Sequence, residues 1–333
     1  MKHDQDEHPA GIERCPVRIY TGTTWQAAVA NIVREVRLEV YLNGKKMITI
    51  ACAGIHTEEL TVGWLRAEGF ITTAREIEAV EVNRDGLSIN VHTKPELAGL
   101  VDKGSALPIG QGAPAAIVDG LPVTGKPVFQ SEAKDAGMII SSSGARGAAM
   151  GMKGSGGKTG LSGSQSRESE IVTGGGAWKE EGAGEGRNVE AMKPLAIGTE
   201  TISPVRIFML MEKLVAAAGI HNLSRGTHGA ALADSSDIIV TREDIGRHNC
   251  LDMLSGYALL HEIECADKVL LRTGRVSSEI VHKIWRMGVP VVLSLSAPTA
   301  LAISLARQVG ITLVGAIRAP SLTVYTLTKR IRG

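Results

Sequence analysis

The chain has 333 residues, of which 44% are hydrophobic and only 3% are aromatic. This content is ample for a packed core, and the length suits one large or two modest domains. The 36 lysines and arginines nearly balance the 35 aspartates and glutamates, for a net charge of +1, which excludes a global attraction to nucleic acid or to an anionic membrane.

Residues 1–16 are polar and charged, and they predict a disordered tail. They contain no apolar stretch of the kind found in signal peptides, and no apolar run in the chain approaches the roughly 18–20 residues of a membrane span. The four cysteines are scattered without a CxxC pair, so neither a disulfide framework nor a metal site is predicted. Free thiols suit a reducing compartment, and we expect a cytoplasmic protein.

Residues 17–143 predict a small α+β region. Asn43-Gly44 and Asp85-Gly86 are hairpin-turn signals between runs of alternating apolar residues. The expected elements are strands at about 35–42 and 46–53, a helix from Thr57 to near Gly69, and strands at about 77–83 and 87–92.

Residues 144–196 predict a flexible insertion. Fourteen of the 39 glycines lie in residues 144–188, and such a stretch buries too little apolar surface to offset its ordering entropy. Gly157-Lys158-Thr159 resembles the end of a phosphate-binding loop, but no predicted strand precedes it and no helix follows.

Residues 197–333 predict an α/β domain, because short apolar runs alternate with helical periodicity. The expected helices span about 204–219, 248–261, 276–287 and 299–309, and the expected strands 237–240, 268–271, 290–294, 312–314 and 322–325. This alternation favours a mainly parallel sheet, in which ligands bind beyond the carboxyl ends of the strands.

Polar residues follow the first of these strands, in the segment TREDIGRHN. Gly246 allows a close approach of the backbone to a ligand, Arg247 suits a phosphate or carboxylate, and His248 can transfer protons. The alternative is a capped helix with an exposed, charged turn.

Later strand ends carry similar residues. Gly274 and Arg275 open a helix whose free amides attract anions, although ordinary helix caps would look the same. His228 lies among glycines, and a pocket role and a purely structural role stay open for it. Together these strand ends predict one anion-binding pocket.

Several motifs then show a family resemblance. TREDIGRHN, TGRVSSEIV, LSLSAPTALAISLA and ITLVGAIR, in that order, resemble the FdhD family of formate dehydrogenase accessory sulfurtransferases, as do SRGTHGAAL and EELTVGWLRAEGFI. The resemblance implies a cytidine deaminase-like C-terminal fold. It also implies transfer of sulfur from a cysteine desulfurase to the molybdenum bis-guanine-dinucleotide cofactor of formate dehydrogenase.

The resemblance also places the cofactor-binding segment at Ala316, Ile317, Arg318, Ala319, Pro320 and Ser321. Ala316 and Ser321 depart from the Phe and Arg usual at its ends. The persulfide cysteines of the family fall on Ser143 and Arg146 here, and a hydroxyl cannot carry a persulfide.

Cys250 is the one stand-in that the sequence offers, because Arg247, His248 and a helix start would lower its pKa. The alternative is that Cys250 is buried in the core, and we expect Cys52 and Cys265 to be core residues as well. Cys15 falls in the predicted tail.

Two functions therefore compete. The chain is either a sulfurtransferase, and so an enzyme, or a cofactor-binding chaperone that no longer transfers sulfur. A zinc nucleoside deaminase is ranked last, because the chain has no PCxxC ligand pair. The expected partners are formate dehydrogenase, a cysteine desulfurase and the guanine-containing cofactor, with a homodimer left open.

Overall fold

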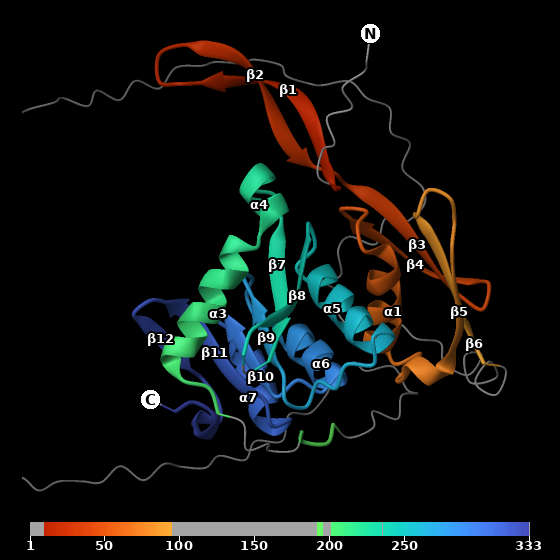
Figure 1. Ribbon diagram of the computed structural model, residues 1–333, viewed down its shortest axis with the longest axis vertical. Coiled ribbons are helices and arrows are strands. Elements are labelled where there is room, and N and C mark those ends of the chain that lie inside the picture. Colours follow the sequence, from red (N-terminus) through yellow and green to blue (C-terminus); the bar gives the residue numbers. More distant parts are fainter. Residues whose placement is uncertain (1–9, 95–191, 196–200, 235, 333) are drawn as a thin grey trace, which may run out of the picture. The chain divides into compact units, whose positions relative to one another are not determined.

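Three β-sheets organise the part of the chain that this computed structural model describes, namely residues 10–94, 192–195, 201–234 and 236–332. Figure 1 shows a two-stranded sheet β1-β2, a four-stranded sheet ordered β4-β3-β6-β5, and a six-stranded sheet ordered β12-β11-β10-β9-β7-β8. The expected mixture of α and β structure is confirmed. Of the predicted insertion, only residues 192–195 belong to the described part of the chain. Ser143 and Arg146 lie outside the described residues.

The four-stranded sheet confirms the predicted N-terminal elements. It consists of β3 (Val36–Leu42), β4 (Lys45–Cys52), β5 (Ile77–Val82) and β6 (Ser88–Thr93), with helix α1 (Thr57–Glu68) and a 3₁₀ turn η1 (Ala74–Glu76). Leu38, Val40 and Leu42 are fully buried and alternate along β3. Asn43 and Gly44 both adopt positive φ, as a tight hairpin turn requires.

A hairpin corrects the prediction of a disordered tail over residues 1–16. Strand β1 (Ile12–Tyr20) pairs antiparallel with β2 (Trp25–Val33) over nine positions. The charged residues and Pro16 of β1 hid its alternation in the sequence. Residues 1–9 lie outside the described part of the chain.

The six-stranded sheet carries the predicted C-terminal elements. Its strands are β7 (His228–Ala233), β8 (Ile238–Asp244), β9 (Val269–Arg272), β10 (Val291–Ser294), β11 (Thr312–Arg318) and β12 (Ser321–Val324). Its helices are α3 (Pro204–Ala216), α4 (Gly219–Ser224), α5 (Asn249–Leu260), α6 (Ser278–Met287) and α7 (Ala300–Gln308), followed by a 3₁₀ turn η2 (Thr328–Arg330). The helix expected over 204–219 is confirmed as α3, which ends at Ala216, and the short helix α4 that follows was not predicted.

The expectation of a mainly parallel sheet needs correction. Strands β9, β10 and β11 are parallel, but β12 is antiparallel to β11, and β7 lies between β8 and β9 and is antiparallel to both. Strand β7 was not predicted, because HGAALA has no β-branched residue to signal a strand. Since β8 and β9 both oppose β7, the four strands β8 to β11 still run in one direction.

Helices α1 and α5 cross at two glycines. A Cβ atom on Gly63 would lie 1.6 Å from the carbonyl oxygen of Asp252, and one on Gly256 would lie 1.9 Å from the carbonyl oxygen of Glu59. Met253 and Leu259 of α5 are buried in the same core as β3, β4 and β6. This backbone-to-backbone contact joins the four-stranded sheet to the six-stranded one.

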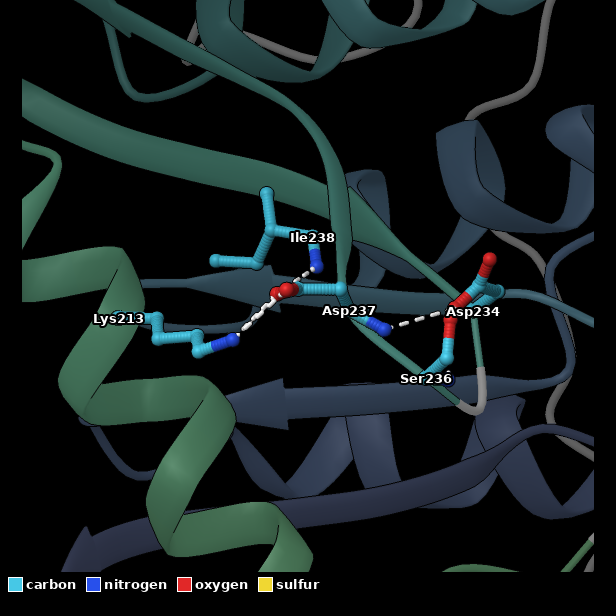
Figure 2. Close-up of polar contacts among 5 residues, drawn as sticks. All are labelled: Lys213, Asp234, Ser236, Asp237 and Ile238. Atoms are coloured by element: carbon cyan, nitrogen blue, oxygen red, sulfur yellow. Dashed lines mark hydrogen bonds and ion pairs between the residues drawn. The ribbon is translucent and has the colours of Figure 1, made fainter.

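The turn between β7 and β8 is fixed by two carboxylates (Figure 2). Asp234 accepts hydrogen bonds from the amides of Ser236 and Asp237 and from the Ser236 hydroxyl. Asp237 accepts from Lys213 Nζ of α3 at 2.7 and 2.8 Å. No helix among the described residues is long and apolar enough to cross a membrane.

Candidate functional site

The carboxyl ends of β8, β9 and β10 form one edge of the six-stranded sheet. His228, the first residue of β7, pairs with Asp244 at the end of β8, and Arg272 pairs with Ser294 at the ends of β9 and β10. Because β7 is antiparallel to its neighbours, its first residue joins their last ones. The topology thus brings His228 to the edge where the ligand site was expected.

Gly274 lies at the centre of this edge. A Cβ atom there would be 3.3 Å from Arg272 Nη2, 3.5 Å from His228 Nδ1 and 3.8 Å from Arg247 Cβ. The absence of a side chain lets Arg272 Nη2, the His228 ring and the Cβ atom of Arg247 lie around one point. We call Arg247, Arg272, His228 and Gly274 the strand-end cluster.

Arg272 is the most unusual member of the strand-end cluster. Its side chain is buried, with only 1% exposed. Its Nε donates to the carbonyl of Gly274 at 2.9 Å, and the Ser294 hydroxyl donates to the same oxygen at 2.9 Å. Its Nη1 is buried and has no hydrogen-bond partner among the described residues.

No carboxylate of a described residue forms an ion pair with Arg272 or Arg247. Burial lowers the pKa of Arg272 to about 10, so the guanidinium stays charged at neutral pH. A buried charge without a counter-ion is strongly unfavourable. The strand-end cluster therefore has the electrostatics of an anion site.

The nearest acidic side chains are engaged elsewhere. Asp244 accepts from the amides of Ala53 and Gly246, each at 2.8 Å, and from Asn249 Nδ2 at 2.6 Å. Glu243 accepts from the first amides of α4, at Ile220 and His221. Both carboxylates hold backbone in place and leave Arg272 without a carboxylate partner among the described residues, whereas Glu279 lies near enough to Arg247 to interact with its charge.

Gly246 makes room for a neighbouring side chain. A Cβ atom there would lie 2.6 Å from Asn249 Nδ2. Asn249 Nδ2 in turn donates to the carbonyl of Ala51 at 2.8 Å. The loop before α5 is thereby fixed to β4, and contact of Gly246 with a ligand stays a prediction.

The two histidines are neutral at pH 7. Burial lowers the pKa of His228, and the charges of Arg272 and Arg247 lower it further. Burial, followed by Lys283 and Arg247, lowers the pKa of His248 to about 3.

His248 is 6% exposed, and its Nε2 lies 3.1 Å from Glu279 Oε2 without the geometry of a hydrogen bond. Burial raises the pKa of that glutamate. Buried beside Glu279, His248 is not placed as a cationic ligand, whereas His228 is exposed at the strand-end cluster.

The turn from Ala316 to Ser321 lies between β11 and β12. Ala316 has a φ of 51°, its amide donates to the carbonyl of Ser296 at 3.3 Å, and the Ala319–Pro320 peptide is cis. Ile317 is buried, whereas Arg318 and Ser321 are exposed.

Arg275 is exposed as well, and no interaction among the described residues links Arg275 or Arg318 to the strand-end cluster. The predicted site residues therefore form two groups at this edge. The Ser296 carbonyl connects the turn to the loop that follows β10.

Cys250 is a core residue in the structure. It is 1% exposed, packs in the core of the six-stranded sheet, and its thiol donates to the carbonyl of His228 at 3.3 Å. Burial raises its pKa well above the ordinary value. This corrects its proposed role as a substitute sulfur carrier, because the buried thiol is neither reachable nor ionised.

Sequence reasoning missed Arg272 and the hydroxyl of Ser294. Arg272 is the last residue of the buried strand VLLR. Its position directly after three aliphatic residues was the sequence signal that could have identified it as a buried arginine. Ser296 Oγ donates to the carbonyl of Thr273 at 2.9 Å, so both serines shape the loop around Gly274. Within the described residues, no group of three histidine, cysteine or acidic side chains is placed to hold a metal ion.

Comparisons with known proteins find relatives over most of the chain. The model of the FdhD/NarQ family matches residues 33–112 and 140–332. A sulfur carrier protein FdhD of Listeria innocua is 30% identical over 96% of this chain and 98% of its own length. The protein of the same name from Staphylococcus aureus strain JH9 is 30% identical over 90% of this chain and 88% of its own.

A solved structure also matches. A crystal structure from Desulfotalea psychrophila, of a candidate formate dehydrogenase accessory protein, has a TM-score of 0.63 and 18% identity, over 96% of this chain and 99% of its own. At that identity the likeness shows a shared fold. The hairpin β1–β2 precedes the part that matches the family model.

Proposed function

The chain belongs to the FdhD/NarQ family, and from this premise we propose that it is an accessory protein of formate dehydrogenase that binds the molybdenum bis-guanine-dinucleotide cofactor at the strand-end cluster. The observation that carries the proposal is the buried guanidinium of Arg272, whose Nη1 has no partner among the described residues. A phosphate oxygen supplies the acceptor and the negative charge that this group lacks.

The strand-end cluster fits a phosphate group in chemistry as well as charge. Arg272 is held by the Gly274 carbonyl, so its remaining donors are fixed before a ligand arrives. Arg247 adds a second cation beside Gly274, and His228 is a neutral ring that can donate one further hydrogen bond. The cofactor is cargo in this proposal, and the chain supplies binding and orientation.

The cysteines favour binding without sulfur transfer. All four lie in the described residues: Cys52, Cys250 and Cys265 are buried, and Cys15 is half-buried on β1. Burial raises the pKa of Cys52 to about 12 and also raises that of Cys265. Since Ser143 and Arg146 replace the expected carrier pair, we propose a chaperone that holds the cofactor for its enzyme.

Sulfur transfer is the second candidate function. The relatives from Listeria innocua and Staphylococcus aureus are both named sulfur carriers. For this chain the role would fall to Cys15, the one thiol that is not buried. Cys15 lies in the hairpin that precedes the match to the family model.

Calorimetric titration with guanosine diphosphate tests the binding proposal. We expect Arg272→Met to weaken binding about 10–100-fold, because a hydrogen-bonded charge contact is lost. Arg75→Gln, at an exposed arginine of η1, is the matched control and should bind as the unaltered chain does. Equal affinity in all three proteins would overturn the proposal.

Intact mass spectrometry after incubation with a cysteine desulfurase and cysteine separates the two functions. A chaperone should show no reducible adduct of about 32 Da, the mass of one sulfur. An adduct that disappears in Cys15→Ser would establish sulfur transfer instead.

A further inference from the structure

A cavity of about 280 Å³ lies at the opposite end of the six-stranded sheet. It is lined by Val269 and Val291, the first residues of β9 and β10, whereas Arg272 and Ser294 are the last residues of these strands. Ile202 and Pro290 complete an apolar floor. The cavity is thus separate from the strand-end cluster.

Positive charge dominates the rim of this cavity. Arg206, Lys268, Arg330 and Arg332 line it, against the single carboxylate of Asp267. Asp267 pairs with Lys268 at 2.5 Å. Arg330 is 3% exposed, and its Nη1 donates to the carbonyl of Gly310 and to Thr312 Oγ1, both at 3.0 Å, so it belongs to the wall.

Arg206 carries the strongest signal. Its Nε and Nη2 are buried and have no hydrogen-bond partner among the described residues. Buried donors of a charged group without an acceptor are unfavourable unless a ligand meets them. Arg206 lies in the first turn of α3, and Ser203, which caps that helix, also lines the cavity.

The neighbouring acidic side chains are already occupied. The turn between β7 and β8 lies at the same end of the sheet, since Ala233 pairs with Val269. Its Asp237 is bound by Lys213, and its Asp234 by the amides and hydroxyl of the turn itself (Figure 2). Lys213 lowers the pKa of Asp237 most, and the charge of Arg206 lowers it further, but neither carboxylate is hydrogen-bonded to Arg206. The positive helix end adds to the positive charge of the cavity.

We propose that this cavity is a second anion site, which binds a small organic phosphate or carboxylate through Arg206 and Arg332. The apolar floor suits the hydrocarbon part of such a ligand, and the cationic rim suits its acidic group. The volume falls just below the range of about 300–1,000 Å³ typical of small-molecule pockets, which suits a small ligand better than a dinucleotide. The proposal does not depend on the function of the strand-end cluster.

Thermal unfolding of the full chain, monitored by fluorimetry, tests the site with inorganic phosphate as the probe. Potassium chloride at matched ionic strength corrects for general salt effects. At saturating phosphate we expect the Tm to rise by about 2–4 °C, because a ligand that binds only the folded state stabilises it. Arg206→Gln should reduce this rise to the part contributed by the strand-end cluster, and Arg75→Gln should retain all of it.

Two further variants keep the result decisive. Arg332→Gln, at an exposed residue close to the C-terminus, should remove the same part of the rise and replaces Arg206→Gln if that variant does not fold. Arg247→Gln alters the strand-end cluster, which is itself proposed to bind phosphate, so it should remove only the part of the rise that remains in Arg206→Gln. The proposal is overturned if phosphate has no effect on the unaltered chain, or if Arg206→Gln and Arg332→Gln both keep the full rise.

Calorimetry with phenyl phosphate tests the organic part of the proposed ligand. Contact of the ring with the apolar floor should raise the affinity about 10-fold over inorganic phosphate. Equal affinities would overturn the assignment to an organic anion.

Discussion

Two arginines at opposite ends of the six-stranded sheet are both buried but are bonded differently. At the amino end, Arg330 directs Nη1 to the Gly310 carbonyl and the Thr312 hydroxyl. At the carboxyl end, Arg272 is fixed through Nε to the Gly274 carbonyl, while its Nη1 has no partner among the described residues. Burial alone therefore does not show whether an arginine has a structural role or is available to a ligand. The number of its donors that already have hydrogen-bond partners distinguishes the two cases.

The largest expected effect comes from the helix crossing that supports only one of these ends. In Gly63→Ala the new methyl group meets the Asp252 carbonyl, so the helices must separate, and we expect the free energy of unfolding to fall by at least about 3 kcal/mol. Chemical denaturation measures the loss, with Gly219→Ala as the control, because a Cβ atom there meets nothing within 4 Å.

The same variant tests whether the two ends are independent. Helix α5 follows the loop that holds Arg247. Hydrogen exchange should therefore accelerate in α1, α5 and that loop, while the amino ends of β9 and β10 stay protected. Uniform acceleration across both ends would show that they unfold as one unit.

A second experiment exchanges each buried arginine for methionine. Arg272→Met should leave the free energy of unfolding unchanged or raise it by about 1 kcal/mol, because an uncompensated buried charge is removed. Arg330→Met should lower it by about 1–3 kcal/mol, because the Gly310 carbonyl and the Thr312 hydroxyl lose a charged donor. Similar losses of stability in both variants would contradict the distinction between the two ends.

Near neutral pH the smallest expected effect is the pH dependence that His248 contributes at the carboxyl end. The pKa of His248 is about 3 in the folded chain, and a free histidine titrates near 6.5. The unfolded chain therefore binds a proton first as the pH falls. The stability contributed by the neutral ring is complete above about pH 6.5 and is lost progressively towards pH 3.

Denaturation at several pH values measures this contribution. The loss should be on the order of 1 kcal/mol per pH unit below pH 6.5, and His248→Gln should remove that component. His261→Gln, at the exposed end of α5, should leave it in place. If His248→Gln has the same pH slope as the unaltered chain, the buried ring is not its source.

Much of the architecture could be predicted because its signals are local. Asn43-Gly44 predicted the β3–β4 hairpin, and the aliphatic runs at 268–271 and 290–294 predicted strands β9 and β10. Strand β7 was missed because Ala230, Ala231 and Ala233 give no strand signal, and only tertiary pairing defines it. The likeness to a cytidine deaminase and the boundaries of the insertion stay predictions.

The candidate site was predictable in position but not in detail. The rule that ligands bind at strand ends located Arg247, Gly274 and His228, which the structure brings together. It could not identify Arg272, whose importance lies in an unmet hydrogen bond that no sequence pattern reveals. The packing of Asn249 against Gly246 and the burial of Cys250 likewise depend on residues far away in the chain.

The burial of three of the four thiols has a practical consequence. In a Cys15→Ser background, a cysteine introduced at Ser321 would be the one thiol open to maleimide reagents, because the other three are enclosed in the folded chain. A fluorophore attached there would report occupancy of the edge next to the β11–β12 turn without further removal of native residues.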